Sequence, residues 1–273
     1  WGVYQNELPD EQLIHNLENY IGQSINNKTI NKWLKEGIFP MPLLRVISLS
    51  SKNPDITLSN LIVNINWFKD NGIGVKVKLP VTRDELLSSK NIYFYGYLLG
   101  DGCISKNIIK LADGHKDKTK VYYSKELMET FQKYLHSYFH VNSTITKVGN
   151  CFHLVLCSKL LTRYLKFFYG YDKDKEIIKI PLLINNDPKN IATFLRGYFD
   201  ADAGIHDFSN SIILKSKDSN FLNSCKDFLE NQGLSLEKVR LDSKRVSYIT
   251  ISSTELMGYA NVIGFNHPRK RLV

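Results

Sequence analysis

The chain has 273 residues and carries 36 Lys and Arg against 27 Asp and Glu, a formal net charge of +9. This length exceeds one average domain, so we expect two or three units, each with its own core. No apolar run approaches the roughly 20 residues of a membrane span, which argues against a membrane protein. The positive charge favours a polyanionic partner, because clustered Lys and Arg release the counterions that surround nucleic acid. A basic protein without such a partner is the alternative.

The four cysteines are widely separated in the chain and include no Cys-x-x-Cys pair. They are Cys103, Cys151, Cys157 and Cys225. This spacing supports neither a zinc site nor a disulfide framework. We therefore expect reduced structural thiols and an intracellular protein, in the cytoplasm, the nucleoid or an organelle matrix.

Residues 1–80 predict a small all-α domain. "PDEQLIHNLENYIG" repeats apolar residues at helical spacing, "NNKTINKWLKEG" predicts a second short helix, and "PMPLLRVISLS" and "TLSNLIVNINWF" predict two more. "NGIGVKVKLP" then predicts a linker or short strand. "KTINKWLKEG" followed by "PLLRVI" resembles the helix-turn-helix domain of repressor-type regulators. The resemblance implies that Lys28, Asn31, Lys32 and Lys35 enter the major groove of DNA. An unrelated helical bundle, with those residues on a solvated face, remains the alternative.

Two later segments repeat one pattern. "YFYGYLLGDGCI" begins at Tyr93 and "FLRGYFDADAG" begins at Phe194. Each contains an apolar, aromatic run with small residues four positions apart, and an aspartate follows the second small residue. The segments that follow also correspond, as in "SKELMETFQKYL" and "SNFLNSCKDFL". An internal duplication of about 90 to 100 residues per copy explains this correspondence, with halves at 83–176 and 177–273. A longer hairpin in one half fits best at "ADGHKDKTK".

Each half predicts a motif helix, two strands, a helix, two strands and a final helix, an α+β fold. In the first half we expect strands at 103–111, 120–123, 144–148 and 151–157, and helices at 125–139 and 158–168. In the second half we expect strands at 205–208, 211–215, 236–241 and 245–252, and helices at 219–232 and 254–263. Polar and proline residues in "KIPLLINNDPKN" suit a connector between the halves.

The small residues of the motif helices predict that the two helices pack closely about a pseudo-twofold axis. Asp101 and Asp202 then fall at the helix C-termini, where the helix dipole and like-charge repulsion both oppose a carboxylate. A divalent cation reverses that field. Mg²⁺ (or Mn²⁺) suits such a site, and two ions about 4 Å apart can support in-line hydrolysis of a phosphodiester. Asp-Gly is also a common turn pair, but finding the same helix and acid twice makes that explanation less probable.

"FYGYLLGDG" and "LRGYFDADA" resemble the two motifs of single-chain LAGLIDADG homing endonucleases, and "KIPLLI" and "IGFNHPRKRL" are also similar to that family. The resemblance covers about residues 83–273. It implies αββαββα halves whose four-stranded antiparallel sheets form a saddle over DNA. It also implies that Asp101 and Asp202 bind the metal with the carbonyls of Gly100 and Ala201.

Two positions depart from the family's motif. Leu99 stands where the first Asp of the motif is expected, and Asp200 occupies that place in the second copy. We expect the enzyme to survive the loss of Asp200. Beside the acids, the family places basic residues that steady the scissile phosphate, and Lys217 is the best candidate, with Lys120 or Lys125 in the first half. Further DNA-binding candidates on or near strands are Lys106, Lys110, Lys147, His153, Lys215, Lys238, Arg240 and Arg245.

The sequence therefore predicts a site-specific, metal-dependent double-strand DNA endonuclease, monomeric and with a long target site. Two alternatives stay open. One is a nuclease-inactive LAGLIDADG DNA-binding regulator or intron maturase, and the other is the endonuclease portion of an intein.

Overall fold

The structure is a computed structural model, and the chain divides into two units, residues 1–66 and 67–273. The structure describes residues 83–170, 178–184, 187–206 and 210–270. It also describes shorter stretches at 14–16, 18–19, 24, 26, 28–29, 68–70, 75–77 and 79. Residues 14–16, 18–19 and 28–29 are helical, and Lys28 is exposed. The predicted positions Asn31, Lys32 and Lys35 lie outside the described residues.

A short hairpin opens the described part of the second unit. Strand β1 (Phe68–Asp70) pairs antiparallel with β2 (Val75–Val77). The predicted strand in "NGIGVKVKLP" is confirmed, whereas Phe68 begins a strand where we expected the end of a helix.

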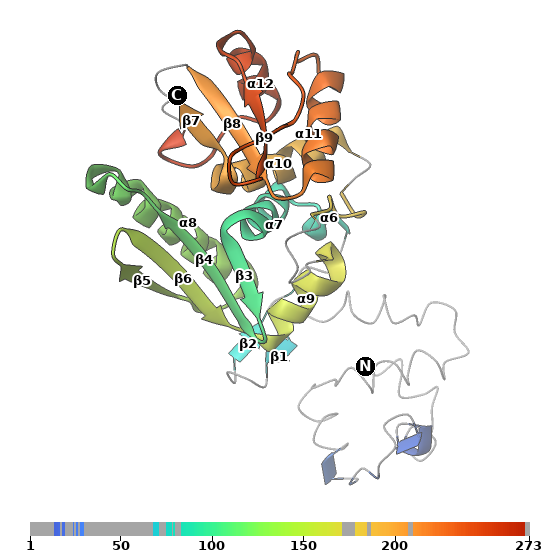
Figure 1. The fold of residues 1–273 in the computed structure, drawn as a ribbon. Coiled ribbons are helices and arrows are strands. Elements are labelled where there is room, and N and C mark those ends of the chain that lie inside the picture. The colour runs from blue at the N-terminus through green and yellow to red at the C-terminus, as the bar shows by residue number, and fades with distance from the viewer. Residues whose placement is uncertain are drawn as a thin grey trace. The chain divides into compact units, whose positions relative to one another are not determined.

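Two halves with the same order of elements follow (Figure 1). After α6 (Arg83–Leu86), the first half consists of α7 (Ser89–Asp101), β3 (Gly102–Ser105), β4 (Ile108–Gly114), the 3-10 turn η1 (Lys118–Lys120), α8 (Val121–Phe139), β5 (Thr144–Val148), β6 (Cys151–Cys157) and α9 (Lys159–Tyr169). The second half consists of α10 (Pro188–Asp202), β7 (Gly204–His206), β8 (Ser211–Ser216), α11 (Ser219–Asn231), β9 (Arg240–Leu241), β10 (Ser247–Ile251), the 3-10 turn η2 (Ser253–Glu255) and α12 (Leu256–Val262). The α+β class and the αββαββα order are confirmed.

Each half holds one four-stranded antiparallel sheet, with strand orders β3-β4-β6-β5 and β7-β8-β10-β9. Alternation along the strands gives each sheet one face of buried apolar side chains, such as Ile109 and Leu111 on β4 and Leu214 on β8. Helices α8 and α11 pack against their sheets on that face. The opposite face of each sheet, which we call the open face, carries the residues that alternate with these buried ones along the strands.

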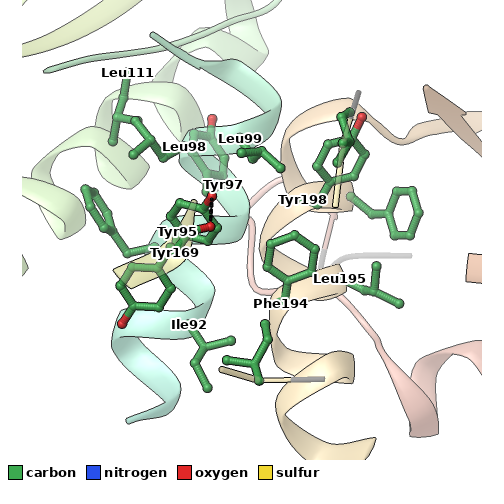
Figure 2. Packing of buried hydrophobic residues seen from close by; sticks show 14 of the residues in the cluster. Ile92, Tyr95, Tyr97, Leu98, Leu99, Leu111, Tyr169, Phe194, Leu195 and Tyr198 are labelled. Atoms are coloured by element: carbon green, nitrogen blue, oxygen red, sulfur yellow. Dashed lines mark hydrogen bonds between the residues drawn. The ribbon is translucent and has the colours of Figure 1, made fainter. Parts of the chain in front are cut away.

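Helices α7 and α10 form the joint between the halves. A Cβ on Gly96 would overlap the backbone carbonyl of Phe194, and a Cβ on Gly197 would overlap that of Tyr93. The glycines are therefore required for the helix backbones to approach this closely, as the small-residue spacing predicts. Buried aromatic rings surround the pair, and Figure 2 shows Tyr95 stacked on Tyr169 with ring centroids 4.6 Å apart.

The first hairpin differs from the prediction. The stretch 103–111, expected to be one strand, instead contains most of β3 and of β4, joined by a turn at Lys106 and Asn107. Helix α8 begins at Val121, where a second strand was expected. Lys106 adopts a φ of 52°, so the turn forms without glycine or proline to announce it. The extra length at "ADGHKDKTK" belongs to the connection from β4 to α8, not to a hairpin.

The remaining elements lie close to their expected positions. Strands β5 and β6 match them, whereas β9 is shorter than expected. All four cysteines are free, and Cys225 is buried. Within the part of the chain that the structure describes, no helix has the length and apolarity to span a bilayer.

Candidate metal and DNA-binding site

The two motif acids lie at the joined ends of the motif helices. Asp101 is the last residue of α7 and Asp202 the last of α10, and both are half-buried. An ideal Cβ on Gly100 would lie 2.5 Å from the Cβ of Ala201 and 3.5 Å from Oδ2 of Asp202. The Asp202 carboxylate therefore lies beside the backbone of the opposite helix. The close approach that glycine permits at Gly100 brings the two copies of the motif together at their acidic ends.

A pocket of about 320 Å³ opens beside Asp202. It is lined by Leu99, Gly100, Ile178, Tyr198, Asp202, Lys215, Ser216, Lys217 and Val246. The fold thus brings the predicted Lys217 to Asp202 and adds Lys215, which the sequence suggested only as a DNA contact. The Tyr198 hydroxyl donates to Ser216 Oγ at 3.3 Å, and burial, followed by the charge of Asp202, raises the pKa of Tyr198 well above its usual value.

The groups at the helix ends suit a hard divalent cation. Asp101, Asp202 and the neighbouring carbonyls of Gly100 and Ala201 are all oxygen donors, the ligands that Mg²⁺ and Mn²⁺ accept. Within the described residues, no three His, Cys, Asp or Glu side chains gather as they would in a closed zinc site. The donor set fits an ion held by two carboxylates that leaves positions open for water and phosphate.

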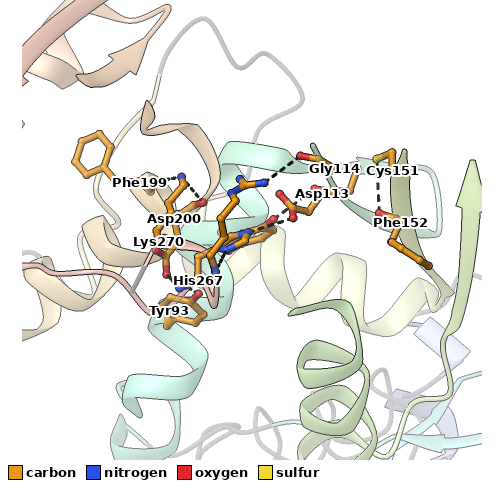
Figure 3. A network of polar contacts seen from close by, with 12 residues as sticks. Tyr93, Asp113, Gly114, Cys151, Phe152, Phe199, Asp200, His267 and Lys270 are labelled. Carbon is orange, nitrogen blue, oxygen red and sulfur yellow. Dashed lines mark hydrogen bonds and ion pairs between the residues drawn. The ribbon is translucent and has the colours of Figure 1, made fainter. Parts of the chain in front are cut away.

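Asp200, two residues before Asp202, has a different environment. It is fully buried, and its Oδ2 accepts hydrogen bonds from the Tyr93 hydroxyl at 2.7 Å and from the backbone N–H groups of Asn266 and His267 at 2.9 and 3.0 Å. Burial raises the pKa of Asp200 despite these donors. The sequence predicted only that Asp200 is dispensable for cutting. The structure shows that Asp200 anchors the C-terminal segment to the joint between the halves (Figure 3).

Lys270 caps the end of α10 from the same segment. Its Nζ donates to the carbonyls of Phe199 and Asp200 in the last turn of the helix at 3.0 and 2.7 Å, and the Phe199 carbonyl also accepts from the Ala203 N–H. Lys270 is buried, and desolvation lowers its pKa to about 8. Lys270 was not among the predicted site residues, although the basic cluster "NHPRKR" was the available signal.

The C-terminal segment also reaches the first half. His267 Nε2 lies 3.1 Å from Asp113 Oδ2 on β4, with both side chains buried, and Arg269 Nη1 donates to the Gly114 carbonyl at 3.3 Å. Burial alone would raise the pKa of Asp113, but the hydrogen bond and charge of His267 outweigh burial and lower it. The stretch "ADGHKDKTK" was expected to be a hairpin, and no local pattern indicates that Asp113 has a partner 154 residues away.

The DNA-binding candidates of the first half separate by face. Strand register places Lys110 and His153 on the open face, whereas Lys147 pairs with Phe152 on the helix-covered face, with its Nζ 5.7 Å from the Phe152 ring. Lys106 lies in the β3–β4 turn. Burial, followed by the charge of Lys110, lowers the pKa of His153. Of the two first-half alternatives for catalysis, Lys120 ends η1 and Lys125 pairs with Glu129 on α8.

The second half gathers more cations. Lys215 and Arg240 share the open face with Tyr248, which pairs with both. Arg245 lies in the turn between β9 and β10, and Lys238 precedes β9. A second pocket, of about 620 Å³, brings five cations together at this edge. They are Lys217, Lys226, Lys238, Arg240 and Arg245. Arg240 also pairs with Glu237, and Lys215 with Asp242.

The sequence of residues 189–263, from α10 to the end of α12, matches the family described as "LAGLIDADG-like domain". The second half is thus similar to a LAGLIDADG-like domain. It contains Asp202, Lys215 and Lys217, and the first half repeats its order of elements. The prediction from the two motifs is confirmed at the level of this domain and its fold.

The chain is also similar to individual proteins over part of its length. The chain is 26% identical over 175 residues to the probable translation initiation factor IF-2 of Methanocaldococcus jannaschii, which covers 62% of this chain and 13% of that protein. It is similar to the homing endonuclease I-DmoI solved with DNA and Mn, at 17% identity and a TM-score of 0.46 over 65% of this chain and 97% of that one.

Two further solved structures are similar to the chain. I-WcaI bound to its DNA recognition sequence has 16% identity and a TM-score of 0.46, over 68% of this chain and 86% of that one. The N-terminal LAGLIDADG domain of DUF199/WhiA has 13% identity and a TM-score of 0.43, over 67% and 82%. These identities and scores are too low to transfer a function.

Proposed function

We propose that the chain is a site-specific DNA endonuclease that hydrolyses both strands of a duplex with a divalent metal ion. The observation that carries the proposal is the pairing of α7 and α10, which brings Asp101 and Asp202 to one end of a glycine-lined joint between two sheets. Carboxylates at helix C-termini are unfavourable for stability alone, so a bound cation gives the arrangement a physical reason.

The chain's own groups suggest a division of roles. Asp101 and Asp202, with the carbonyls of Gly100 and Ala201, would hold Mg²⁺ or Mn²⁺. The ion would supply positive charge to the scissile phosphate and lower the pKa of a bound water. Lys217 and Lys215, in the pocket with Asp202, would neutralise phosphate charge in the second half. The packed joint would hold both acids at a fixed spacing, so that each half acts on one strand.

The duplex would lie across the open faces of the two sheets. Lys110 and His153 face it from the first half and Lys215 and Arg240 from the second, and the basic pocket at the β9 edge would contact the backbone beyond. Two sheet faces can contact more base pairs than one, which fits a long target site read by one chain. We further propose that residues 83–176 and 177–273 are the two halves of the nuclease, and that residues 1–80 add helix-turn-helix-type contacts, including Lys28.

The test is cleavage of a duplex selected from random DNA by the wild-type chain, with Mg²⁺ or Mn²⁺. Asp101→Asn and Asp202→Asn should each reduce double-strand cutting at least about a thousandfold, because each removes a charge that holds the ion. Asp84→Asn, an exposed acid on α6, is the matched control and should cut normally. Full double-strand cutting by either motif variant would reject the mechanism. Specific binding by the wild type without cutting in either metal would favour a DNA-binding regulator.

The role of the N-terminal residues has its own test. Replacing Lys28, Lys32 and Lys35 together with alanine should weaken binding and reduce the salt slope by about two to three, because up to three phosphate contacts would be lost. An unchanged slope would reject a DNA-binding role for that helix.

A further inference from the structure

The two halves differ at one position beside the motif acids. Gly102 pairs with Leu111 on β4, and Gly204 pairs with Ile213 on β8. Gly102 directly follows Asp101, whereas Gly204 is the second residue after Asp202, so Ala203 is the second-half equivalent of Gly102. When this one-residue offset is taken into account, the register makes Leu214 the equivalent of Leu111. Three residues on, Gly114 is then the first-half equivalent of Lys217. The second half therefore has a cation on its own strand end where the first half has no side chain.

The C-terminal segment places a cation at that position. Arg269 Nη1 donates to the carbonyl of Gly114 at 3.3 Å, so the guanidinium of the second half lies at the strand end of the first. A Cβ on Gly114 would lie 2.7 Å from the carbonyl oxygen of Asn150, so a lysine at this position would require the neighbouring strand to move. The C-terminal segment therefore supplies the cation, because the strand has no room for a side chain at Gly114.

The segment that carries Arg269 is held firmly. The Arg269 N–H donates to His267 Nδ1 at 3.1 Å, and Nε2 of the same ring contacts Asp113 at 3.1 Å. On the other side, the buried Lys270 bonds two carbonyls at the end of α10. Buried contacts before and after Arg269 therefore fix its backbone, and only one guanidinium nitrogen bonds Gly114 in this structure.

We propose that Arg269 is the phosphate-binding cation of the first half-site, supplied by the C-terminal segment and equivalent to Lys217 in the second. The inference rests on the proposed nuclease function. A guanidinium presents five N–H donors in a planar fork and can bond two phosphate oxygens while keeping another contact. Strand register also relates this strand end to the first motif acid, because Asp101 directly precedes Gly102 and Gly102 pairs with Leu111, three residues before Gly114.

The experiment follows each strand separately. The substrate is a supercoiled plasmid with one copy of the duplex selected by the wild-type chain, and it is cut in Mg²⁺. After the reaction the plasmid is linearised and the two strands are given different end labels, so that the cutting rate of each strand is measured separately. Arg269→Ala should slow one strand by about 10 to 100-fold, the value of a charge-assisted hydrogen bond, and nicked plasmid should accumulate. Lys217→Ala should slow the opposite strand by a similar factor. Arg269→Lys should recover most of the loss, and Arg163→Ala on α9, an exposed arginine, should leave both strands at wild-type rates.

Different outcomes separate this inference from the proposed function. Equal slowing of both strands by Arg269→Ala, or wild-type rates on both, would overturn the inference while the wild-type cutting upholds the function. If the wild type binds but cuts neither strand, the proposed function fails, and phosphate-ethylation interference on the bound duplex decides the inference by itself. Loss of interference at one phosphate in Arg269→Ala supports it, and an unchanged pattern rejects it.

Discussion

The two halves of the molecule share their topology but use different chemistry at equivalent positions of the motif. In α7 the Tyr95 hydroxyl donates to the carbonyl of Tyr169 at the end of α9, and in α10 the equivalent Arg196 donates to the carbonyl of Ile263 at the end of α12. Four residues further along, the first half has Leu99 and the second has Asp200. The contact of the motif helix with the final helix of its half is therefore preserved at Tyr95 and Arg196, although the residues that make it differ.

The difference between Leu99 and Asp200 has a consequence for assembly. The Asp200 carboxylate accepts a hydrogen bond from the Tyr93 hydroxyl. Phe194 is the second-half equivalent of Tyr93 and has no hydroxyl, so the equivalent bond cannot form at Leu99. The polar pair is thus confined to one side of the pseudo-twofold axis, where the C-terminal segment docks. The Asp200 side of the joint is therefore the side that this carboxylate ties to the C-terminal segment.

The largest effect should come from removing that polar anchor. Asp200→Ala leaves the Tyr93 hydroxyl and the N–H groups of Asn266 and His267 without their acceptor, so we expect the free energy of unfolding to fall by about 4 kcal/mol. Tyr93→Phe removes one donor and should cost about 1 kcal/mol. Urea unfolding measures both. Asp227→Ala is the exposed control, and an Asp200→Ala loss no larger than this control would show that the anchor is unimportant.

A somewhat smaller effect should follow from filling the joint. Gly96→Ala and Gly197→Ala place a methyl group against the backbone carbonyls of Phe194 and Tyr93, so each should destabilise the chain by about 3 kcal/mol. Similar losses would show that the joint is symmetric even where the polar anchor is not. Gly204→Ala is the control, because no atom lies within 4 Å of its Cβ position. Thermal unfolding compares the three, and a stable Gly96→Ala would contradict the close packing.

The stability of the chain should depend on pH through the buried Lys270. Its pKa of about 8 in the fold lies below the ordinary 10.5, so the unfolded chain binds more protons between these values and stability rises with pH. The slope should reach at most about 1.4 kcal/mol per pH unit. Lys270→Met should lose this contribution, whereas the tyrosines and Cys225 titrate alike in both proteins. The difference in unfolding free energy between wild type and Lys270→Met, measured from pH 7.5 to 9.5, should therefore grow with pH. A constant difference would mean that Lys270 has an ordinary pKa.

The smallest effect should distinguish the two faces of the first-half sheet. Lys110→Ala on the open face should reduce the salt slope of DNA binding by about one, since one phosphate contact is lost. Lys147→Ala on the helix-covered face is the matched control and should leave the slope unchanged. Equal effects of the two variants would place the DNA somewhere other than on the open face.

Elements with strong periodicity were predictable from the sequence. Strands β5 and β6 alternate over "TITKV" and "CFHLVLC", and α11 begins after Asp218, whose side chain caps Asn220 and Phe221. The first hairpin was not predictable, because its turn depends on a positive φ at Lys106 that no local residue announces. Strand β9 is short because only Arg240 and Leu241 find partners on β10.

The candidate site divides in the same way. The repeated motif alone pointed to Asp101, Asp202 and their close-packed helices, because a spacing of four places small residues on one helix face wherever the helix lies. The neighbourhood of those acids depends on contacts between residues far apart in the chain. Alternation could not tell that Lys147 faces the helices and Lys110 the open side, since that requires knowing which face the helices cover.

The sequence by itself determined that two copies of one motif exist, that each ends in an acid and that each is followed by the same order of helices and strands, because these features follow from local periodicity and repetition. Only the tertiary structure decided that Asp200 anchors the C-terminal segment, that His267 pairs with Asp113 and that Arg269 bonds the Gly114 carbonyl. Those contacts join residues 66 to 155 positions apart, and burial gives them their strength. Local sequence patterns do not indicate contacts between residues so far apart in the chain. The partners are identified only when the C-terminal segment is placed across the joint.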